Sequence, residues 1–533
     1  MNAEISKFYE LSKAKICDET TQLFTNLAPK IQAWLNCDEF RQNYSHLAYA
    51  PLLNPKSINY LTSDPKFCFI LNIPLPKVFD FFIFGSHGVS LESALPGFLK
   101  LCGCKCVARD GEKDSQMMYI SYFKRLIKAH IAKQNGKYVS IALLIADFIQ
   151  DELNEKFYAL VPQAKTLYIV RDPITNLKTL CNLEQQKCDI KVKNDELSEI
   201  SNDLGDALEI IKRKGRKKIA YRFSDDPYKL SQNLVSYAKN VNGEFLPASN
   251  APSPEAVNLW IFDLYQGFHD GVLFRALVNI KNEDILIKKT DDFIGKNAMV
   301  TMSELARHFG FLQPKKSDEW LFNLRVSDYK ALLPAVVIAN VNDALYNENL
   351  LGVGGKHVKQ DLSKNHKLAL IDENENLLIL IHDAFMDNDD FTDISELFEI
   401  PAIFRILLED SKNLKRVKVQ QMLAKLRPYI KELCACLQNQ VKAQKQKKLS
   451  ENDILEYFKK HEQERMIFYG LLKQHLRVLD ALRPDILASY EYYKKFLKLC
   501  EKDENEYRLI RQADKSYAYA LFTKEHLEKL GLN

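Results

Sequence analysis

The sequence lacks several features that would assign it at once to a class of protein. Its 533 residues carry a formal net charge of only +4, so charge gives no reason to expect a nucleic-acid or membrane-surface partner. No apolar run is long enough to span a membrane, and the polar start, with Glu4 and Glu10, does not resemble a signal peptide. Internal repeats and long low-complexity linkers are also missing. We expect a cytoplasmic globular chain of two or three domains, in peripheral contact with a membrane at most.

The cysteines give no sign of disulfides or of a metal site. There are 11 of them, an odd number, scattered mostly among apolar residues, which predicts reduced thiols in the core. Cys102, Cys104 and Cys106 alternate in LCGCKC, but a zinc-type site needs a fourth ligand and a different spacing. We therefore expect no metal at this stretch.

The most informative stretch lies between residues 157 and 180. Thr166–Val170 is a short apolar run rich in β-formers and predicts a buried strand. Arg171 follows it, and Asp172-Pro173 is typical of a helix start. Such a joint directs backbone N–H groups and a helix dipole at an anion, and the arginine adds a planar fork for phosphate. Thr179, eight residues after the arginine, adds a hydroxyl. The alternative is an ordinary joint whose arginine pairs with a surface carboxylate.

An earlier stretch has the layout of a phosphate cradle. Val78–Phe84 predicts a central strand, and residues 91–101 predict a helix that Pro96 interrupts. Between them lies a loop of small and hydroxyl residues, whose candidate ligands are Gly85, Ser86, His87, Gly88 and Ser90. This is no Walker A motif, because the Lys-Ser/Thr pair is missing. The alternative is a phosphate-free joint in which Ser86 and Ser90 cap the helix.

His87 is the titratable group of that loop and the candidate catalytic residue. When protonated, it would stabilise charge on a leaving phosphate, and when neutral it would act as a base for an acceptor hydroxyl. The alternative is a histidine that only bonds a backbone carbonyl.

A third stretch, residues 283–311, repeats the pattern of strand, turn and helix. Ile285–Lys288 predicts a strand, followed by an acidic turn with Asp291 and Asp292. Ala298–Phe309 predicts a helix that ends at Gly310, which is a good C-cap.

These three stretches together resemble the sulfotransferases. Arg171-Asp172-Pro173 with a hydroxyl residue eight positions after the arginine resembles their 3′-phosphate-binding motif, and the loop at 85–90 stands where they carry the 5′-phosphate loop. The stretch 283–311 is similar to their last core element. The sequence departs from the family in two places: Thr179 replaces the usual serine, and the first loop has no lysine or arginine. The resemblance implies a P-loop fold over roughly residues 70–315 and the nucleotide donor PAPS.

The following part of the chain changes character. Ala335–Ala339 predicts a strand, and the segments 367–371 and 377–381 predict a β-hairpin. Asp387 and Asp389 follow the hairpin, and an Asp-x-Asp at a strand end resembles the metal-binding motif of one large glycosyltransferase class. There, two carboxylates would bridge Mg²⁺ or Mn²⁺ to a sugar nucleotide. The alternative is a solvated acidic turn.

The last part of the chain predicts helices throughout, with a capping-box-like start at Ser450–Asp453. Residues 471–497 are similar to the C-terminal end of a family of campylobacter proteins. These proteins are encoded near capsule and flagellar glycan loci and are called sugar transferases without proof. The resemblance implies surface-glycan biosynthesis but supplies no reaction.

The sequence thus predicts an α/β protein with a parallel-sheet, sulfotransferase-like P-loop core, a small β-rich insert and an all-helical C-terminal domain. The expected divisions are a helical N-terminal extension at 1–70, a nucleotide-binding domain at 71–315, a β-containing insert or cap at 316–400 and the helical domain at 401–533.

The expected function is transfer of a sulfuryl or phosphoryl-type group, such as phosphoramidate, to a sugar hydroxyl of a cell-surface glycan. The donor would be PAPS or a related nucleotide, the partners would be donor and glycan acceptor, and this mechanism requires no metal. Two alternatives stay open. One is a metal-dependent glycosyltransferase using Asp387 and Asp389, and the other is a non-catalytic nucleotide- or glycan-binding protein.

Overall fold

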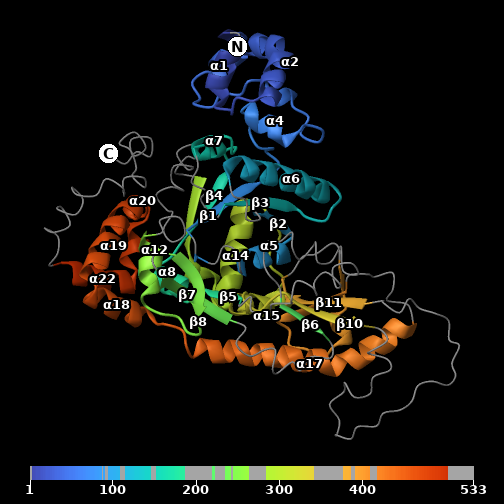
Figure 1. The fold of residues 1–533 in the computed structure, drawn as a ribbon, viewed down its shortest axis with the longest axis vertical. Coiled ribbons are helices and arrows are strands. Elements are labelled where there is room, and N and C mark those ends of the chain that lie inside the picture. Colours follow the sequence, from blue (N-terminus) through green and yellow to red (C-terminus); the bar gives the residue numbers. More distant parts are fainter. Residues whose placement is uncertain are drawn as a thin grey trace, which may run out of the picture. The chain divides into compact units, whose positions relative to one another are not determined.

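The computed structural model divides the chain into two compact units (Figure 1). Unit 1 is made of residues 1–180, 257–323 and 450–533, and unit 2 is made of residues 181–256 and 324–449. The described residues are 3–86, 88–89, 94–108, 114–145, 152–186, 219–222, 235–241, 244–262, 284–340, 376–385, 391–408 and 417–501. Each unit is assembled from separate segments of the sequence. The four divisions expected from the sequence are continuous ranges, and they stay a prediction.

A five-stranded parallel sheet forms the centre of unit 1, which confirms the expected α/β core. Its strands lie in the order β2-β3-β1-β4-β9. They are β1 (Phe81–Gly85), β2 (Cys104–Val107), β3 (Ser140–Ile145), β4 (Lys165–Val170) and β9 (Ile285–Lys289). Every residue of β1 and β3 is buried, because helices cover both faces of the sheet. Their near-continuous apolar runs follow from this burial.

Helices α5 (Ala94–Leu101) and α6 (Ser115–Gln134) lie on opposite faces of this sheet (Figure 1). The chain moves in opposite directions from β1 to β2 and from β2 to β3, so right-handed crossovers require this arrangement. Pro96 does not interrupt α5, contrary to expectation, because the helix begins at Ala94 and its first turn needs no proline N–H.

Aromatic side chains pack α14 and α6 against the sheet and α7 against α6. Phe309, the last residue of α14 (Lys296–Phe309), stacks on Phe81 of β1 with ring centroids 4.3 Å apart. Tyr122 of α6 stacks on Phe157 of α7 (Asn154–Ala159) and donates its hydroxyl to the Leu144 carbonyl at 2.7 Å. The remaining elements around the sheet are α8 (Pro173–Cys181), α12 (Ala256–Phe262), η3 (Thr290–Phe293), η4 (Lys316–Asp318) and α15 (Glu319–Phe322).

The described C-terminal residues of unit 1, up to residue 501, form a helical bundle, as the sequence predicts. It contains α18 (Glu451–Lys460), α19 (Glu462–His475), α20 (Arg477–Leu482), α21 (Pro484–Ala488) and α22 (Glu491–Cys500). Phe458, Phe468 and Phe496 meet at its centre. The capping box at Ser450 is confirmed, since Ser450 and Asp453 bond each other's backbone amides.

Unit 2 combines two sheets with one long helix. Its three-stranded antiparallel sheet contains β5 (Glu184–Gln186), β7 (Val235–Val241) and β8 (Glu244–Ser249). The second sheet has the order β12-β13-β11-β10-β6 and contains β6 (Ile219–Arg222), β10 (Ala335–Asn340), β11 (Asn376–Asp383), β12 (Thr392–Asp393) and β13 (Phe404–Leu408). Two short 3₁₀ helices, η5 (Val326–Tyr329) and η7 (Ser395–Leu397), and α17 (Val417–Lys445) complete it.

The expectation that residues 401–533 are helical throughout is wrong for β13. Phe404–Leu408 pairs antiparallel with β11 and β12, because its apolar side chains complete the core of that sheet. The strand predicted at 335–339 is confirmed in β10, and the second arm of the predicted hairpin lies in β11. Its first arm, at 367–371, lies outside the described residues.

Ion pairs and hydrogen bonds anchor the C-terminal end of α17 within unit 2. Lys445 pairs with Asp328 at 2.7 Å and Lys448 pairs with Glu184 at 2.9 Å. Tyr237 donates its hydroxyl to Gln444 at 2.9 Å. Lysines near a helix C-terminus also interact favourably with its dipole. Among the described residues, no helix has both the length and the apolarity to cross a membrane.

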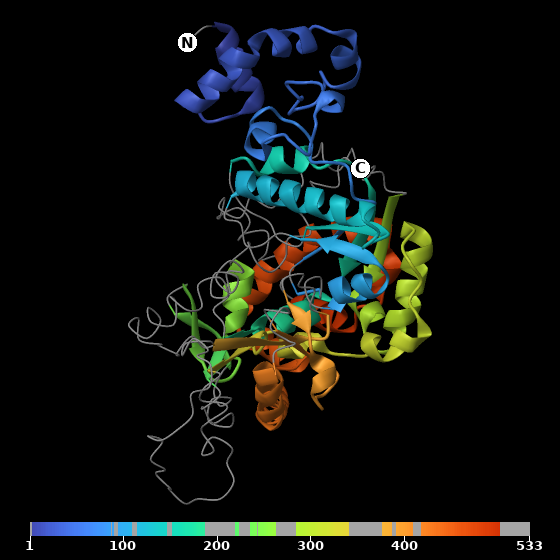
Figure 2. The same cartoon turned by 90° about the vertical axis from the view of Figure 1, so that its right-hand side faces the viewer.

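The N-terminal part of unit 1 contains four helices (Figure 2). They are α1 (Ala3–Ser12), α2 (Asp18–Leu35), α3 (Asp38–Asn43) and α4 (Pro65–Ile70), with the 3₁₀ helix η1 (Pro55–Ser57) before α4. Lys156 of α7, only 1% exposed, donates to the Ser12 carbonyl at 2.5 Å and lies over the Phe69 ring. Burial lowers the pKa of this lysine to about 7, because it disfavours the charged ammonium.

Lys156→Met should raise the free energy of unfolding near neutral pH, and this gain over the wild type should shrink as the pH rises. Below about pH 7 the wild-type protein buries a charged ammonium. Between the folded pKa and the ordinary value of 10.5, the unfolded chain binds a proton that the folded chain lacks, so wild-type stability rises with pH. Urea unfolding should therefore show the variant's advantage at about pH 6 and its loss near about pH 10.

The matched control is Lys128→Met, which changes an exposed lysine of α6 in the same unit. It should alter stability little, and equally at each pH. A variant at position 156 that is less stable than wild type at about pH 6 would show that the carbonyl and the ring outweigh the desolvation of the ammonium.

Candidate functional site

The carboxyl ends of β1 and β4 mark the natural ligand position of unit 1. These strands are neighbours at the centre of the sheet. The chain leaves β1 toward β2, on one side, and β9 lies beyond β4 on the other side. In open α/β sheets, ligands bind where neighbouring strands have connections that diverge in this way. The candidate site therefore consists of the described residues that follow the two strands, which are Ser86, Gly88 and Val89 after β1 and 171–173 after β4.

The loop after β1 requires glycine at position 88. Gly88 has a φ of +89°, which disfavours any other residue. A Cβ atom there would lie 2.3 Å from Oδ1 of Asn176 in α8, so the close approach excludes a side chain as well. Ser86, 4% exposed, is buried beside it. His87 and Ser90 lie outside the described residues, so their predicted roles stay predictions.

Arg171 joins the two segments. Its Nη1 donates a hydrogen bond to the carbonyl oxygen of Gly88 at 2.9 Å. Thr290, the first residue of η3, donates its hydroxyl to the carbonyls of Val89 and Val170 at 3.3 and 3.4 Å. The ends of β1, β4 and β9 thus meet. The sequence signalled the acidic turn after β9, but nothing in it pointed to the threonine.

The Arg171 hydrogen bond also fixes the direction of a backbone amide. In a trans peptide the C=O and the N–H point in opposite directions. The Gly88 carbonyl points at Arg171, so the Val89 amide in the same peptide plane points away from it. The Val89 amide therefore lies on the side of this peptide plane that faces away from the guanidinium.

Arg171 keeps its charge in a partly buried position. Burial lowers the pKa of the guanidinium, while the nearby carboxylates of Asp291, Glu451 and Asp172 raise it. Its Nε has no hydrogen-bond partner among the described residues. Since a guanidinium carries five donors, the bond to Gly88 does not use all of them.

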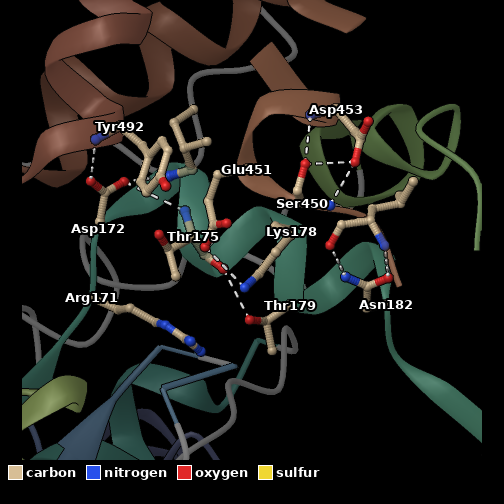
Figure 3. A network of polar contacts seen from close by, with 12 residues as sticks. Arg171, Asp172, Thr175, Lys178, Thr179, Asn182, Ser450, Glu451, Asp453 and Tyr492 are labelled. Carbon is tan, nitrogen blue, oxygen red and sulfur yellow. Dashed lines mark hydrogen bonds and ion pairs between the residues drawn. The ribbon is translucent and has the colours of Figure 1, made fainter. Parts of the chain in front are cut away.

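Asp172 caps two helices at once (Figure 3). Its Oδ1 accepts the amide of Ile174 in α8 at 2.9 Å, which confirms the predicted N-cap. Its Oδ2 accepts the amides of Tyr492 and Tyr493 at the start of α22, at 3.0 and 3.1 Å. Burial raises the pKa of this carboxyl and these amides lower it. The second cap comes from a segment 320 residues away, which local sequence could not reveal.

Arg171 and Thr179 lie along the same side of α8 (Figure 3). The Thr179 hydroxyl donates to the Thr175 carbonyl at 2.9 Å, so it must rotate before it can donate to a phosphate. Lys178, one residue earlier, pairs with Glu451 of α18 at 2.9 Å. Burial raises the pKa of Glu451, but the bonds to Lys178, to its own backbone amide and to Thr175 together outweigh burial, so the pKa lies below its usual value.

The described residues contain no cluster of three or more histidine, cysteine or acidic side chains that could hold a metal ion. Burial raises the pKa of Cys102 and Cys106 to about 12, which keeps both thiols neutral. Asp387 and Asp389 lie outside the described residues. The predicted alternative of a metal site there stays a prediction.

Comparison with known families identifies one match. Residues 289–502 are similar to the family described as "Protein of unknown function (DUF2972)". No curated protein and no solved structure matches the chain. The comparisons return no sulfotransferase or P-loop family, so the parallel sheet supports an α/β core and nothing finer. The matched stretch includes Thr290, Glu451 and Tyr492, whereas Arg171 and Gly88 precede it.

Asp172→Asn should destabilise unit 1 by about 1–3 kcal/mol. Asparagine caps a helix as well as aspartate, but its amide nitrogen cannot accept the N–H groups of Tyr492 and Tyr493. The midpoint of urea unfolding measures this loss.

Asp114→Asn is the control, because Asp114 caps only α6, accepting the Met117 amide at 2.7 Å. It should change stability by less than about 0.5 kcal/mol. Equal effects of the two substitutions would show that the bonds to α22 contribute nothing.

Proposed function

We propose that unit 1 binds a nucleotide-activated donor at the carboxyl ends of β1 and β4. It then transfers a sulfuryl or phosphoryl-type group to a sugar hydroxyl of a cell-surface glycan. The observation that carries the proposal is the 2.9 Å hydrogen bond from Arg171 to Gly88. It joins a small-residue loop to an arginine at the position where open α/β sheets bind ligands.

Two separate anion positions support a donor with two phosphate groups. The Val89 amide and the Arg171 guanidinium point in different directions, so one phosphate would meet the loop amides and another would meet Arg171 and Thr179. The N-terminus of α8 adds a favourable dipole beside the second position. PAPS carries one phosphate on the 3′ position and another on the 5′ position of its ribose, so its negative charges are separated in this way.

The catalytic step would need a group that stabilises the leaving phosphate and a base for the acceptor hydroxyl. His87 is the proposed group, on sequence grounds alone. The glycan acceptor likewise rests on the resemblance of residues 471–497. The metal-dependent glycosyltransferase and the non-catalytic binding protein stay alternatives, because no described residue favours either.

Adenosine 3′,5′-bisphosphate (PAP) should raise the melting temperature of the wild-type protein. At about 100 times its Kd a ligand adds about 2.7 kcal/mol of stability. Arg171→Ala should weaken binding about 10- to 100-fold, since it removes a charged hydrogen-bonding fork and releases Gly88. Arg171→Lys should restore binding only in part, because an ammonium lacks the planar fork.

Arg307→Ala is the matched control, since Arg307 is an exposed arginine of α14 in the same unit. It should bind PAP as the wild type does. Isothermal titration with each variant measures the affinities directly. A wild-type protein that ignores PAP, but responds to a UDP- or CDP-linked sugar with Mn²⁺, would replace this proposal with the glycosyltransferase. Binding without turnover on capsule oligosaccharide would favour the non-catalytic protein.

A further inference from the structure

One buried polar side chain beside the loop lies outside the recognised motifs. Asn176 is in the second turn of α8 and only 2% exposed. Its Nδ2 donates to the hydroxyl oxygen of Ser86 at 3.4 Å. Both partners are buried, so this contact sits inside the protein rather than in the ligand space.

The other end of the same carboxamide fills the space beside Gly88. Its Oδ1 has no hydrogen-bond partner among the described residues. It occupies the place that a side chain at position 88 would take, 2.3 Å from an added Cβ. Rotating the amide by half a turn would only exchange its nitrogen and oxygen.

A buried amide oxygen without a partner is destabilising, and an apolar side chain of the same shape would avoid this loss. Unfavourable local arrangements that persist in this way cluster at functional sites. Here the asparagine contacts two residues of the candidate anion loop at once, Ser86 and Gly88. These contacts with the loop explain why a polar side chain stands at position 176.

We propose that Asn176 is a positioning residue that holds Ser86, Gly88 and Val89 in an anion-binding conformation. This rests on the proposed function. Asn176 fixes Ser86 and shapes the turn at Gly88, Arg171 fixes the Gly88 carbonyl, and Thr290 fixes the Val89 carbonyl. Together they keep the Val89 amide directed away from Arg171, toward its own phosphate.

A consequence is that the two proposed anion positions are structurally coupled. Arg171 precedes α8 and Asn176 lies within it, and both donate hydrogen bonds to residues that follow β1. The segment that holds one phosphate thus also shapes the cradle for the other. A change at Asn176 weakens ligand binding without touching the ligand.

Asn176→Leu tests this inference, because leucine has a similar shape but no polar atoms. The melting temperature of the free protein should stay the same or rise, since a buried unpartnered oxygen is removed. The Kd for PAP should increase about 10-fold. Asn297→Leu, at an exposed position of α14, is the control and should change neither quantity.

A double-mutant cycle gives a second test that does not depend on the leucine variant. Gly88→Ala places a methyl group against the carboxamide, and Asn176→Ala removes that obstacle. The double variant should therefore lose less PAP affinity than the product of the two single losses. Additive losses would show that the two residues do not act together on the loop.

The outcomes separate this inference from the proposed function. Wild-type affinity for PAP in Asn176→Leu overturns the positioning role while the donor site stands. A fall in melting temperature with unchanged affinity also overturns it, since that is a purely structural role. If the wild-type protein binds neither PAP nor pyrophosphate, the donor site and the positioning role fail together.

Discussion

The hydrogen bond from Arg171 to Gly88 is the interaction on which the candidate site depends. It joins segments 83 residues apart and turns two separate strand ends into one surface. The parallel sheet makes the bond possible, because it places the carboxyl ends of β1 and β4 side by side. The bond in turn orients the loop, because a carbonyl held by the guanidinium leaves the next amide pointing the other way. Fold, loop conformation and anion chemistry are linked through this one contact.

Charge limits which ligand the site can hold. Arg171 lies near the carboxylates of Asp291, Glu451 and Asp172, and each of them favours its charged form. Much of its positive charge is therefore balanced before a ligand arrives. The first loop also lacks the lysine or arginine that sulfotransferases carry there. If the proposed donor binds here, loop amides and the dipole of α8 would supply more of the attraction for its phosphates than in those enzymes.

Sequence reasoning succeeded where the signal was local. The apolar runs of β1 and β4 and the Asp172-Pro173 helix start are found within a few residues of the expected positions. It failed at β13, where Phe404–Leu408 is too short for its apolar pattern to distinguish a strand from a helix, and its partners β11 and β12 decide the outcome. It also missed Asn176 and Thr290, because their roles depend on contacts with the distant loop after β1. A division of the sequence into consecutive segments also cannot predict that the chain alternates between two discontinuous units.

The matched family region and the first part of the chain supply different halves of the same site. The stretch 289–502 provides Thr290, which holds the loop, and the amides of α22, which hold Asp172. It contains neither the loop nor the arginine. Asp172 stands directly between Arg171 and the first residue of α8, so its bonds to α22 hold the backbone next to Arg171. The helical bundle therefore supports the candidate site through Asp172, and the matched stretch contains that support without Arg171 and Gly88.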